Sequence, residues 1–254
     1  MSDTSSRTPK TGAWLSDGST AVGEIVASLG FDFVVLDVEH GAFDLTTLER
    51  FIPLLKGLGL EVFSKVLVPE RGAVQQALDF GSDGVIIPHI ESAEHAEFVT
   101  SYGKFPPLGS RSLAGGRTMG YGGYDDDWVE QQNRDVKVFP MVEDPGALRD
   151  VEKIAALPTV DGIFIGPGDL SQTGGRGAYT RTEEDFDDFR AVVSAVRANR
   201  KQWVFPAWST VEKEFAVSED ADYALLTMQH VAVVRGYEEG LKEMEAVRAG
   251  TCSG

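Results

Sequence analysis

The chain has 254 residues, 42% of them hydrophobic, and a formal net charge of −17 at pH 7. This length suits a single domain with a substantial buried core. The negative charge disfavours non-specific binding to nucleic acid or to an anionic membrane surface, because both require a positive protein potential. We therefore expect neither kind of partner.

The cysteine content and the N-terminal sequence indicate the compartment. Cys252 is the single cysteine, so the chain can form no intramolecular disulfide and no cysteine-based zinc site. The N-terminus lacks the apolar segment of a secretory signal, and no apolar run is long enough to cross a membrane. We expect a cytoplasmic protein with a polar leader over residues 1–10, one domain over 11–248 and a flexible tail over 249–254.

The first half of the domain alternates strand and helix patterns. In residues 45–58, for example, apolar side chains recur at intervals of three and four, and Gly59 follows as a helix stop. The expected strands are 12–15, 31–38, 62–68 and 84–88, and the expected helices are 21–29, 45–58, 73–80 and 93–102.

Residues 105–135 interrupt this alternation. The segment is rich in glycine and proline and is too long for an ordinary connection, which is typical of an active-site cover or of a disordered loop. Its glycines do not match a P-loop or a dinucleotide fingerprint, since both require a strand before and a helix directly after. We expect no phosphate binding by this loop.

The alternation resumes after residue 136 and completes eight strand-helix units. The expected strands are 137–142, 161–165, 203–207 and 222–227, and the expected helices are 146–156, 183–199, 210–217 and 231–248. Eight such units in a chain of this length predict an α/β fold, a (β/α)8 TIM barrel, over an open doubly wound sheet.

Two acidic residues follow successive predicted strands. Glu143 ends the run Val138 to Val142, and Asp169 follows Ile163 to Ile165 after two glycines and a proline. Active sites of α/β barrels lie at the carboxyl ends of the strands, and two hard oxygen ligands suit Mg²⁺ or Mn²⁺. The alternative is structural: Glu143 caps the next helix and Asp169 ends a turn.

The second predicted strand ends in a further group of titratable residues. Asp37 and Glu39 share one face because side chains alternate along a strand, and His40 begins the loop. A histidine beside carboxylates is a candidate general base, although it can equally hydrogen-bond the turn. We rank His89, after Pro88, lower because Glu91 and Ser92 behind it are typical of a helix start.

These motifs resemble the HpcH/HpaI aldolase family, including its macrophomate synthase branch, over about residues 11–235. The resemblance is carried by the following segments: Leu36-Asp-Val-Glu-His-Gly41, Ala77-Leu-Asp-Phe-Gly81, Ile86-Ile-Pro88, Pro106-Pro-Leu-Gly-Ser-Arg111, Val142-Glu143 and Ile163-Phe-Ile-Gly-Pro-Gly-Asp-Leu-Ser171. It implies a (β/α)8 barrel with class II aldolase chemistry on pyruvate-type enolates. It also implies a hexamer in which the last helix is exchanged between partners.

The resemblance assigns roles to individual residues. Glu143 and Asp169 match the ligands of a divalent metal ion, Mg²⁺ or Mn²⁺. His40 with Asp37 matches a His-Asp pair that acts through a metal-bound water, and Glu39 matches its acidic neighbour. Gly168, in the same motif as Asp169, is expected to line the substrate site. A metal held there would polarise the ketone of a 2-oxo acid and stabilise its enolate.

The sequence departs from the family pattern at two positions. Where the family carries an arginine on its third strand, the segment Val66-Leu67-Val-Pro69 places Leu67, and where it carries glutamine before the metal glutamate, this chain has Met141. We expect both residues to line the substrate site. Lys65 shares the face of Leu67 if the strand continues, and Arg71 and Arg111 are further candidates to bind an anionic substrate.

Three functions remain open at this point. The first is a metal-dependent carbon-carbon lyase whose small anionic, 2-oxo-acid-like substrate has diverged from free pyruvate. The second is a metal-dependent decarboxylase, dehydratase or cyclase on the same scaffold, which Leu67 and Met141 favour. The third is a non-catalytic binding barrel, against which the joint presence of Asp37, His40, Glu143 and Asp169 argues.

The predicted C-terminal helix, 231–248, has an apolar side that requires a cover. Its apolar residues are Val231, Val233, Val234, Leu241, Met244 and Val247. We expect this side to pack on a neighbouring copy in a homo-oligomer.

Overall fold

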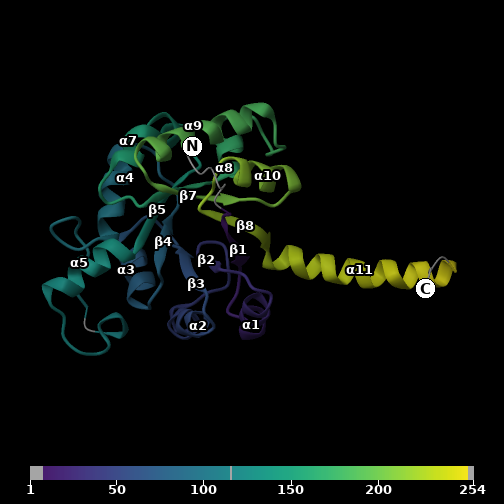
Figure 1. Ribbon diagram of the computed structural model, residues 1–254, viewed down its shortest axis with the longest axis horizontal. Coiled ribbons are helices and arrows are strands. Elements are labelled where there is room, and N and C mark those ends of the chain that lie inside the picture. The colour runs from purple at the N-terminus through teal and green to yellow at the C-terminus, as the bar shows by residue number, and fades with distance from the viewer. Residues whose placement is uncertain (1–7, 115, 251–254) are drawn as a thin grey trace, which may run out of the picture.

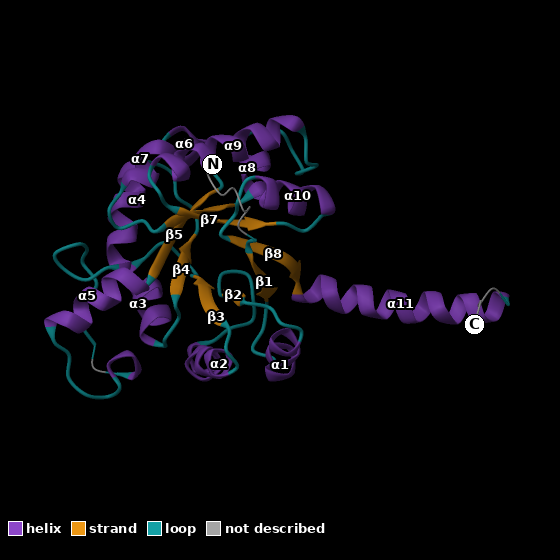
Figure 2. Cartoon of the chain, in the orientation of Figure 1, coloured by secondary structure: helices purple, strands orange, loops and turns teal. Residues whose placement is uncertain are grey.

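The computed structural model describes residues 8–114 and 116–250, and within these ranges the chain forms a (β/α)8 barrel, as predicted (Figures 1 and 2). Parallel strands close in the order β1 to β8, and Figure 2 shows helices around them. The strands are β1 Lys10–Leu15, β2 Phe33–Asp37, β3 Glu61–Lys65, β4 Gly84–Ile87, β5 Lys137–Val142, β6 Gly162–Ile165, β7 Gln202–Pro206 and β8 Tyr223–Met228.

The helices follow the predicted alternation with two additions, and the predicted helix 146–156 is divided into α6 and α7. The sequence pattern did not predict α5 within the long connection or α8 directly after β6. The helices are α1 Thr20–Ser28, α2 Leu45–Gly57, α3 Arg71–Asp79, α4 Ala93–Thr100, α5 Asp126–Asp135, α6 Pro145–Arg149, α7 Val151–Ala156, α8 Pro167–Thr173, α9 Glu183–Ala198, α10 Thr210–Ser218 and α11 Gln229–Ala249. None of these described helices is long and apolar enough to cross a membrane.

The barrel interior is filled by aromatic rings below the carboxyl ends of the strands. Phe33, Phe63, Phe139 and Tyr223 pack mostly edge to face, with ring centroids 5.2 to 6.0 Å apart. Such contacts add to the free energy of area burial. This layer fills the barrel interior, so a ligand can bind only at the rim formed by the carboxyl ends of the strands.

The long connection 105–135 does not cover the rim where Glu143 and Asp169 lie. It joins α4 to β5, and every helix-to-strand connection of this fold runs at the amino ends of the strands. The buried Lys104 fixes its start there, since its ammonium lies 2.8 Å from the Asp161 carboxylate and donates to the Val136 carbonyl at 2.6 Å. The predicted active-site cover is therefore wrong, for a topological reason.

Strand β3 ends three residues earlier than predicted, at Lys65 instead of residue 68. Leu67 therefore lies beyond the strand and does not share the inward face of Lys65. Its side chain is 53% exposed and lines an apolar cavity of about 510 Å³ between α2 and α3, which Phe43 and Leu48 also line. This placement changes the role that Leu67 can have in a site.

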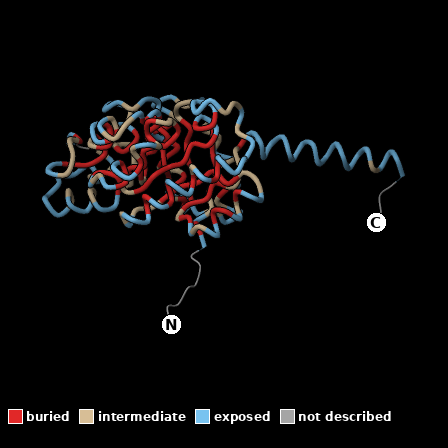
Figure 3. The backbone as a smooth tube through the Cα atoms, turned by 90° about the horizontal axis from the view of Figure 1, so that it is seen from above, coloured by how far each residue is buried: buried red, intermediate tan, exposed pale blue. Residues whose placement is uncertain are grey.

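Helix α11 projects away from the barrel (Figures 1 and 3). Its first residue, Gln229, anchors it: the side-chain oxygen accepts from the Ser16 N–H at 2.9 Å, and the amide donates to Asp17 at 2.8 Å. Beyond this anchor the helix is almost entirely exposed, including its apolar residues. The predicted leader (except residues 8–10), Cys252 and most of the predicted tail lie outside the described residues.

Candidate active site

The carboxyl ends of β2 and β3 bring a buried lysine between two acids. Asp37 and Lys65 are register partners and the last residues of their strands. The Lys65 ammonium forms an ion pair with Glu39 and lies 3.7 Å from Asp37. The indole N–H of Trp14 donates to the other Asp37 oxygen at 3.0 Å. Asp37 and Lys65 are each only 5% exposed, so their charges meet in a region largely shielded from water.

Glu143 follows β5 and points into the same rim. One of its oxygens accepts a hydrogen bond from the backbone N–H of His89 at 2.7 Å. The neighbouring residue Gly166 leaves the room for it, because a Cβ there would come within 2.7 Å of the Glu143 Cβ and 3.0 Å of its Oε2. A glycine at this point is therefore a steric requirement of the site.

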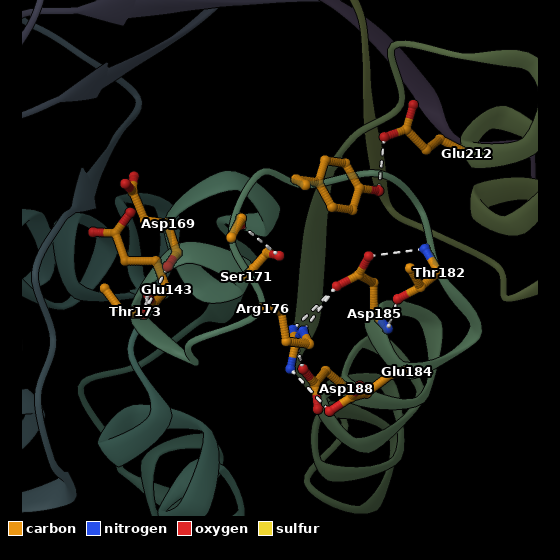
Figure 4. Close-up of polar contacts among 12 residues, drawn as sticks. Glu143, Asp169, Ser171, Thr173, Arg176, Thr182, Glu184, Asp185, Asp188 and Glu212 are labelled. Atoms are coloured by element: carbon orange, nitrogen blue, oxygen red, sulfur yellow. Dashed lines mark hydrogen bonds and ion pairs between the residues drawn. The ribbon is translucent and has the colours of Figure 1, made fainter.

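Asp169 lies in the first turn of α8, where Pro167 starts the helix. Figure 4 shows its carboxylate next to that of Glu143. Gly168 and Asp169 are exposed, whereas Glu143 is buried. The two acids predicted from successive strands are thus together, one accessible to solvent and one not.

The environments of the carboxyl groups shift their pKa values in opposite directions. Burial raises the pKa of Glu143, the charge of Asp169 adds to this, and the His89 N–H and Lys65 oppose it without cancelling it. Burial would also raise the pKa of Glu39, but the hydrogen bond and charge of Lys65, with help from His89, lower it below its usual value. Glu39 is held as an anion, while Glu143 lacks a sufficient positive neighbour.

His89, which the sequence ranks below His40, lies between Glu39 and Glu143. Its ring Nε2 lies 2.5 Å from Glu39 Oε1, and its Nδ1 lies 3.7 Å from Glu143. It adopts φ = 58°, a left-handed conformation in which histidine is enriched and which often marks functional sites. Its position directly after the Ile87-Pro88 strand end was the signal available in the sequence.

His40 lies at the edge of this cluster. Its backbone N–H, and not its ring, donates to Asp37 at 3.2 Å. The ring Nε2 lies 3.5 Å from Glu39 Oε2, and the side chain is 66% exposed. The imidazole is therefore free to meet a ligand from the solvent side.

The other predicted substrate-binding residues lie in different places. Met141 is buried in the barrel interior, and its Cε would lie 3.2 Å from a Cβ at position 166. Arg71 instead donates to the Ser110 carbonyl and stacks over Tyr102, and Arg111 is buried against Asp79 at 2.7 Å. The structure thus gives both arginines roles in attaching the connection 105–112 to α3, away from Glu143.

The acids at the rim fit a divalent cation as a pair. Within residues 8–114 and 116–250, no group of three or more His, Cys, Asp and Glu side chains is arranged to hold a metal. Glu143 and Asp169 supply two hard oxygen donors, and a cation between them would favour the ionised form of Glu143, whose pKa is raised by burial and further by the charge of Asp169. The remaining ligands would be water and substrate, as is usual for Mg²⁺.

A (β/α)8 barrel with acids and a buried lysine at the carboxyl ends of its strands has the architecture of an enzyme. Residues 10–223 match the family model described as HpcH/HpaI aldolase/citrate lyase. The chain belongs to this family.

Curated relatives of the chain are aldolases. It is 34% identical to a 2-dehydro-3,6-dideoxy-6-sulfogluconate aldolase of Pseudomonas putida over 165 residues, 65% of this chain and 64% of that protein. It is 35% identical to a hydroxypyruvate/pyruvate aldolase of Paraburkholderia phytofirmans over 170 residues, 64% of this chain and 65% of that protein. The matches thus span just under two thirds of each relative.

Solved structures share the whole fold. An HpcH/HpaI aldolase from Desulfitobacterium hafniense superposes with a TM-score of 0.87 at 25% identity, covering 94% of this chain and 93% of the other. Macrophomate synthase gives a TM-score of 0.81 at 22% identity, covering 96% and 86%. The latter likeness concerns the fold alone.

Proposed function

We propose that the protein is a divalent-metal-dependent carbon-carbon lyase that acts on a small anionic 2-oxo acid. The observation that carries the proposal is the convergence of Glu143 and Asp169 beside the Lys65, Glu39 and His89 cluster. Membership of the family supports it, as do the aldolase relatives, whose names include hydroxypyruvate and pyruvate.

Glu143 and Asp169 would hold the metal ion, Mg²⁺ or Mn²⁺. When bound, the ion would supply Lewis acidity that stabilises the negative charge developing on the substrate ketone oxygen. Gly168, exposed in the same turn, leaves open space for a ligand beside Asp169, since no atom lies within 4 Å of a Cβ built there. Met141 and the aromatic layer exclude water from below.

Lys65 would be the cation that binds the substrate carboxylate. The sequence comparison placed the family arginine at Leu67, but Leu67 lies beyond β3 and outside the barrel interior. Lys65 is the basic residue that ends β3 and faces inward, in register with Asp37. An ammonium is a point charge and not a planar fork, so it holds a carboxylate with less directional constraint than arginine would. The part of the case for a reaction other than aldol chemistry that rested on Leu67 is weakened accordingly, and the part that rests on Met141 remains.

His40 would move the proton. Its exposed ring lies 3.5 Å from Glu39, whose carboxylate is kept ionised by Lys65 and can orient the imidazole. Asp37 fixes the backbone of the same turn through the His40 N–H. These residues would place a base on the solvent side of a substrate held between Lys65 and the acid pair.

Deuterium exchange into the methyl group of pyruvate tests the proposal. Wild type should exchange in Mg²⁺ or Mn²⁺ and stop in EDTA, and Glu143→Gln should exchange far more slowly. Glu152→Gln, which makes the same change on the exposed face of α7, should behave as wild type. Exchange that persists in EDTA, or that Glu143→Gln does not slow, would overturn the metal-dependent mechanism. A folded wild type that binds no metal and exchanges no deuterium would favour the non-catalytic barrel.

We also propose that the protein is a homo-oligomer, for which the family resemblance implies a hexamer. The exposed apolar residues of α11 support this, because a long unpaired helix with such residues needs a cover. Light scattering at micromolar concentration should give a multiple of the chain mass, and a monomer would refute the proposal. A cytoplasmic location stays a prediction.

A further inference from the structure

Helix α8 is tied to the end of β5 by one hydroxyl group. The hydroxyl of Thr173, in the last turn of α8, lies within hydrogen-bonding distance of two backbone carbonyls and shares its single proton between them: that of Asp169 at 2.6 Å and that of Glu143 at 3.1 Å. The first contact spans one helical turn and is common for threonine. The second spans 30 residues of sequence and joins two separate elements of the barrel. A single side chain thus touches the backbone of both acids (Figure 4).

We propose that Thr173 is a positioning residue that fixes the separation of the Glu143 and Asp169 carboxylates. This inference rests on the proposed function, in which these two acids hold the metal ion. Thr173 touches neither a metal ion nor a substrate in this role, and acts only through the backbones of the two acids.

The need for such a tie follows from how differently the two acids are supported. Glu143 is buried, constrained by Gly166 and held by the His89 N–H. Asp169 is exposed and stands on a short helix of seven residues. Short helices are marginal without tertiary contacts, so the position of Asp169 depends on what fastens α8 to the barrel.

Other side chains also hold the C-terminal part of this helix and the loop after it. The Ser171 hydroxyl donates to the Gly177 carbonyl at 3.1 Å, and the Arg176 guanidinium binds Asp185 and Asp188 (Figure 4). The first contact attaches α8 to the loop after it, and the second attaches that loop to α9. Among the described residues, Thr173 supplies the side-chain hydrogen bond from α8 to the backbone of Glu143.

The chemistry predicts a specific pattern of substitutions. Thr173→Val keeps the shape and removes the hydroxyl, whereas Thr173→Ser keeps the hydroxyl. Loss of a partner that orients a metal ligand typically weakens metal affinity by about 10- to 100-fold. We expect Thr173→Val to weaken Mn²⁺ binding by at least about tenfold and Thr173→Ser to retain nearly all of the wild-type affinity.

Two measurements on the full chain decide the proposal. Mn²⁺ affinity is measured by electron paramagnetic resonance of free Mn²⁺, and amide hydrogen exchange of α8 is measured by mass spectrometry in metal-free protein. Faster exchange in α8 together with weaker Mn²⁺ binding in the valine variant, both restored by serine, supports the proposal. Unchanged exchange, or faster exchange with unchanged Mn²⁺ affinity, overturns it.

The same design separates failure of this inference from failure of the proposed function. If wild type binds no Mn²⁺, the metal site and the positioning role fall together, whatever the exchange shows. If wild type binds Mn²⁺ and Thr173→Val binds it equally well, the metal site stands and the role of Thr173 falls.

Discussion

Two lysines are buried at opposite ends of the barrel, and their surroundings differ. Lys104, 1% exposed at the amino end, donates to the carbonyls of Asn133 and Val136 and pairs with Asp161. Lys65, 5% exposed at the carboxyl end, pairs with two carboxylates, and the more distant, Asp37, lies beyond hydrogen-bond range at 3.7 Å. Three acceptors saturate the Lys104 ammonium, whereas Glu39 is the one carboxylate among these partners within hydrogen-bonding range of Lys65.

The comparison teaches that burial of a charge does not by itself mark a functional site. The Lys104 ammonium makes all of its hydrogen bonds within the protein, and it attaches the long connection to the amino end of the barrel. Its pKa is lowered by burial, although Asp161 opposes the shift. Lys65 belongs to a chain of polar contacts that continues through Glu39 and His89 to Glu143. A buried lysine whose carboxylate partners lie beside the exposed side chain of His40, at the rim that also holds the exposed Asp169, is what distinguishes the candidate active site.

The largest expected effect is on the free energy of unfolding, which should depend strongly on Lys104. Lys104→Met should lower the free energy of unfolding by about 3–5 kcal/mol, because it leaves Asp161 and two buried carbonyls without their donor. Urea denaturation measures this. Lys153→Met, on the surface of α7 with its side chain 73% exposed, is the matched control and should cost no more than about 0.5 kcal/mol. A small loss in Lys104→Met would show that the two ends do not differ as described.

The next effect is on catalysis. Lys65→Met should lower kcat/KM for pyruvate exchange by roughly 10- to 150-fold, the equivalent of the 1.5–3 kcal/mol of one charge-assisted hydrogen bond. Lys65→Arg, which keeps the charge, should recover part of the loss. If Lys65→Met instead exchanged pyruvate normally and unfolded as easily as Lys104→Met, Lys65 would be a second structural lysine.

Much of this architecture could be predicted from the sequence. The strand and helix periods gave the barrel, and glycines and prolines gave the strand ends at which Glu143 and Asp169 lie. Asp37 and Glu39 were correctly assigned to one end of β2, because alternation along a strand is a local rule. Each of these features depends on neighbours within a few residues.

The remainder depends on contacts between distant segments. The end of β3 at Lys65 was not visible, because Val66 to Val68 continue the apolar pattern of the strand. The position of the long connection follows from barrel topology, in which helix-to-strand connections lie at the amino ends of the strands, and not from the composition of the segment. His89 could be placed between Glu39 and Glu143 only by the closure of the barrel, 50 and 54 residues apart in sequence.

A smaller effect, on the pH dependence of stability, follows from the raised pKa of Glu143 at the carboxyl end of the barrel. In metal-free protein the folded state holds a proton on Glu143 that the unfolded state has released. Stability should therefore fall as pH rises from the ordinary glutamate pKa through the raised value. Saturating Mn²⁺ requires the ionised form, so this negative slope should disappear, because affinity rises by up to about tenfold per pH unit in this window and offsets it.

Glu143→Gln isolates this pH effect from the other carboxyl groups. The unfolding free energies of wild type and this variant are measured in urea from pH 4 upward. Without metal, the difference between them should decrease as pH rises. The variant should show no pH-dependent change in Mn²⁺ affinity from this group. A slope of the same sign with and without Mn²⁺ would contradict binding of the metal at Glu143.

The smallest expected effect tests which residue takes the place of the family arginine. Leu67→Arg places a long charged side chain at a half-exposed position beyond β3, where it can extend into solvent from the edge of the cavity between α2 and α3. The free energy of unfolding should change by no more than about 0.5 kcal/mol, and pyruvate exchange should be nearly unchanged. Introduced into Lys65→Met, it should restore little of the lost exchange, because the barrel interior is reached from the end of β3 and not from the loop after it. A strong gain in either background would show that position 67 reaches the substrate, and that Lys65 is not the residue that replaces the arginine.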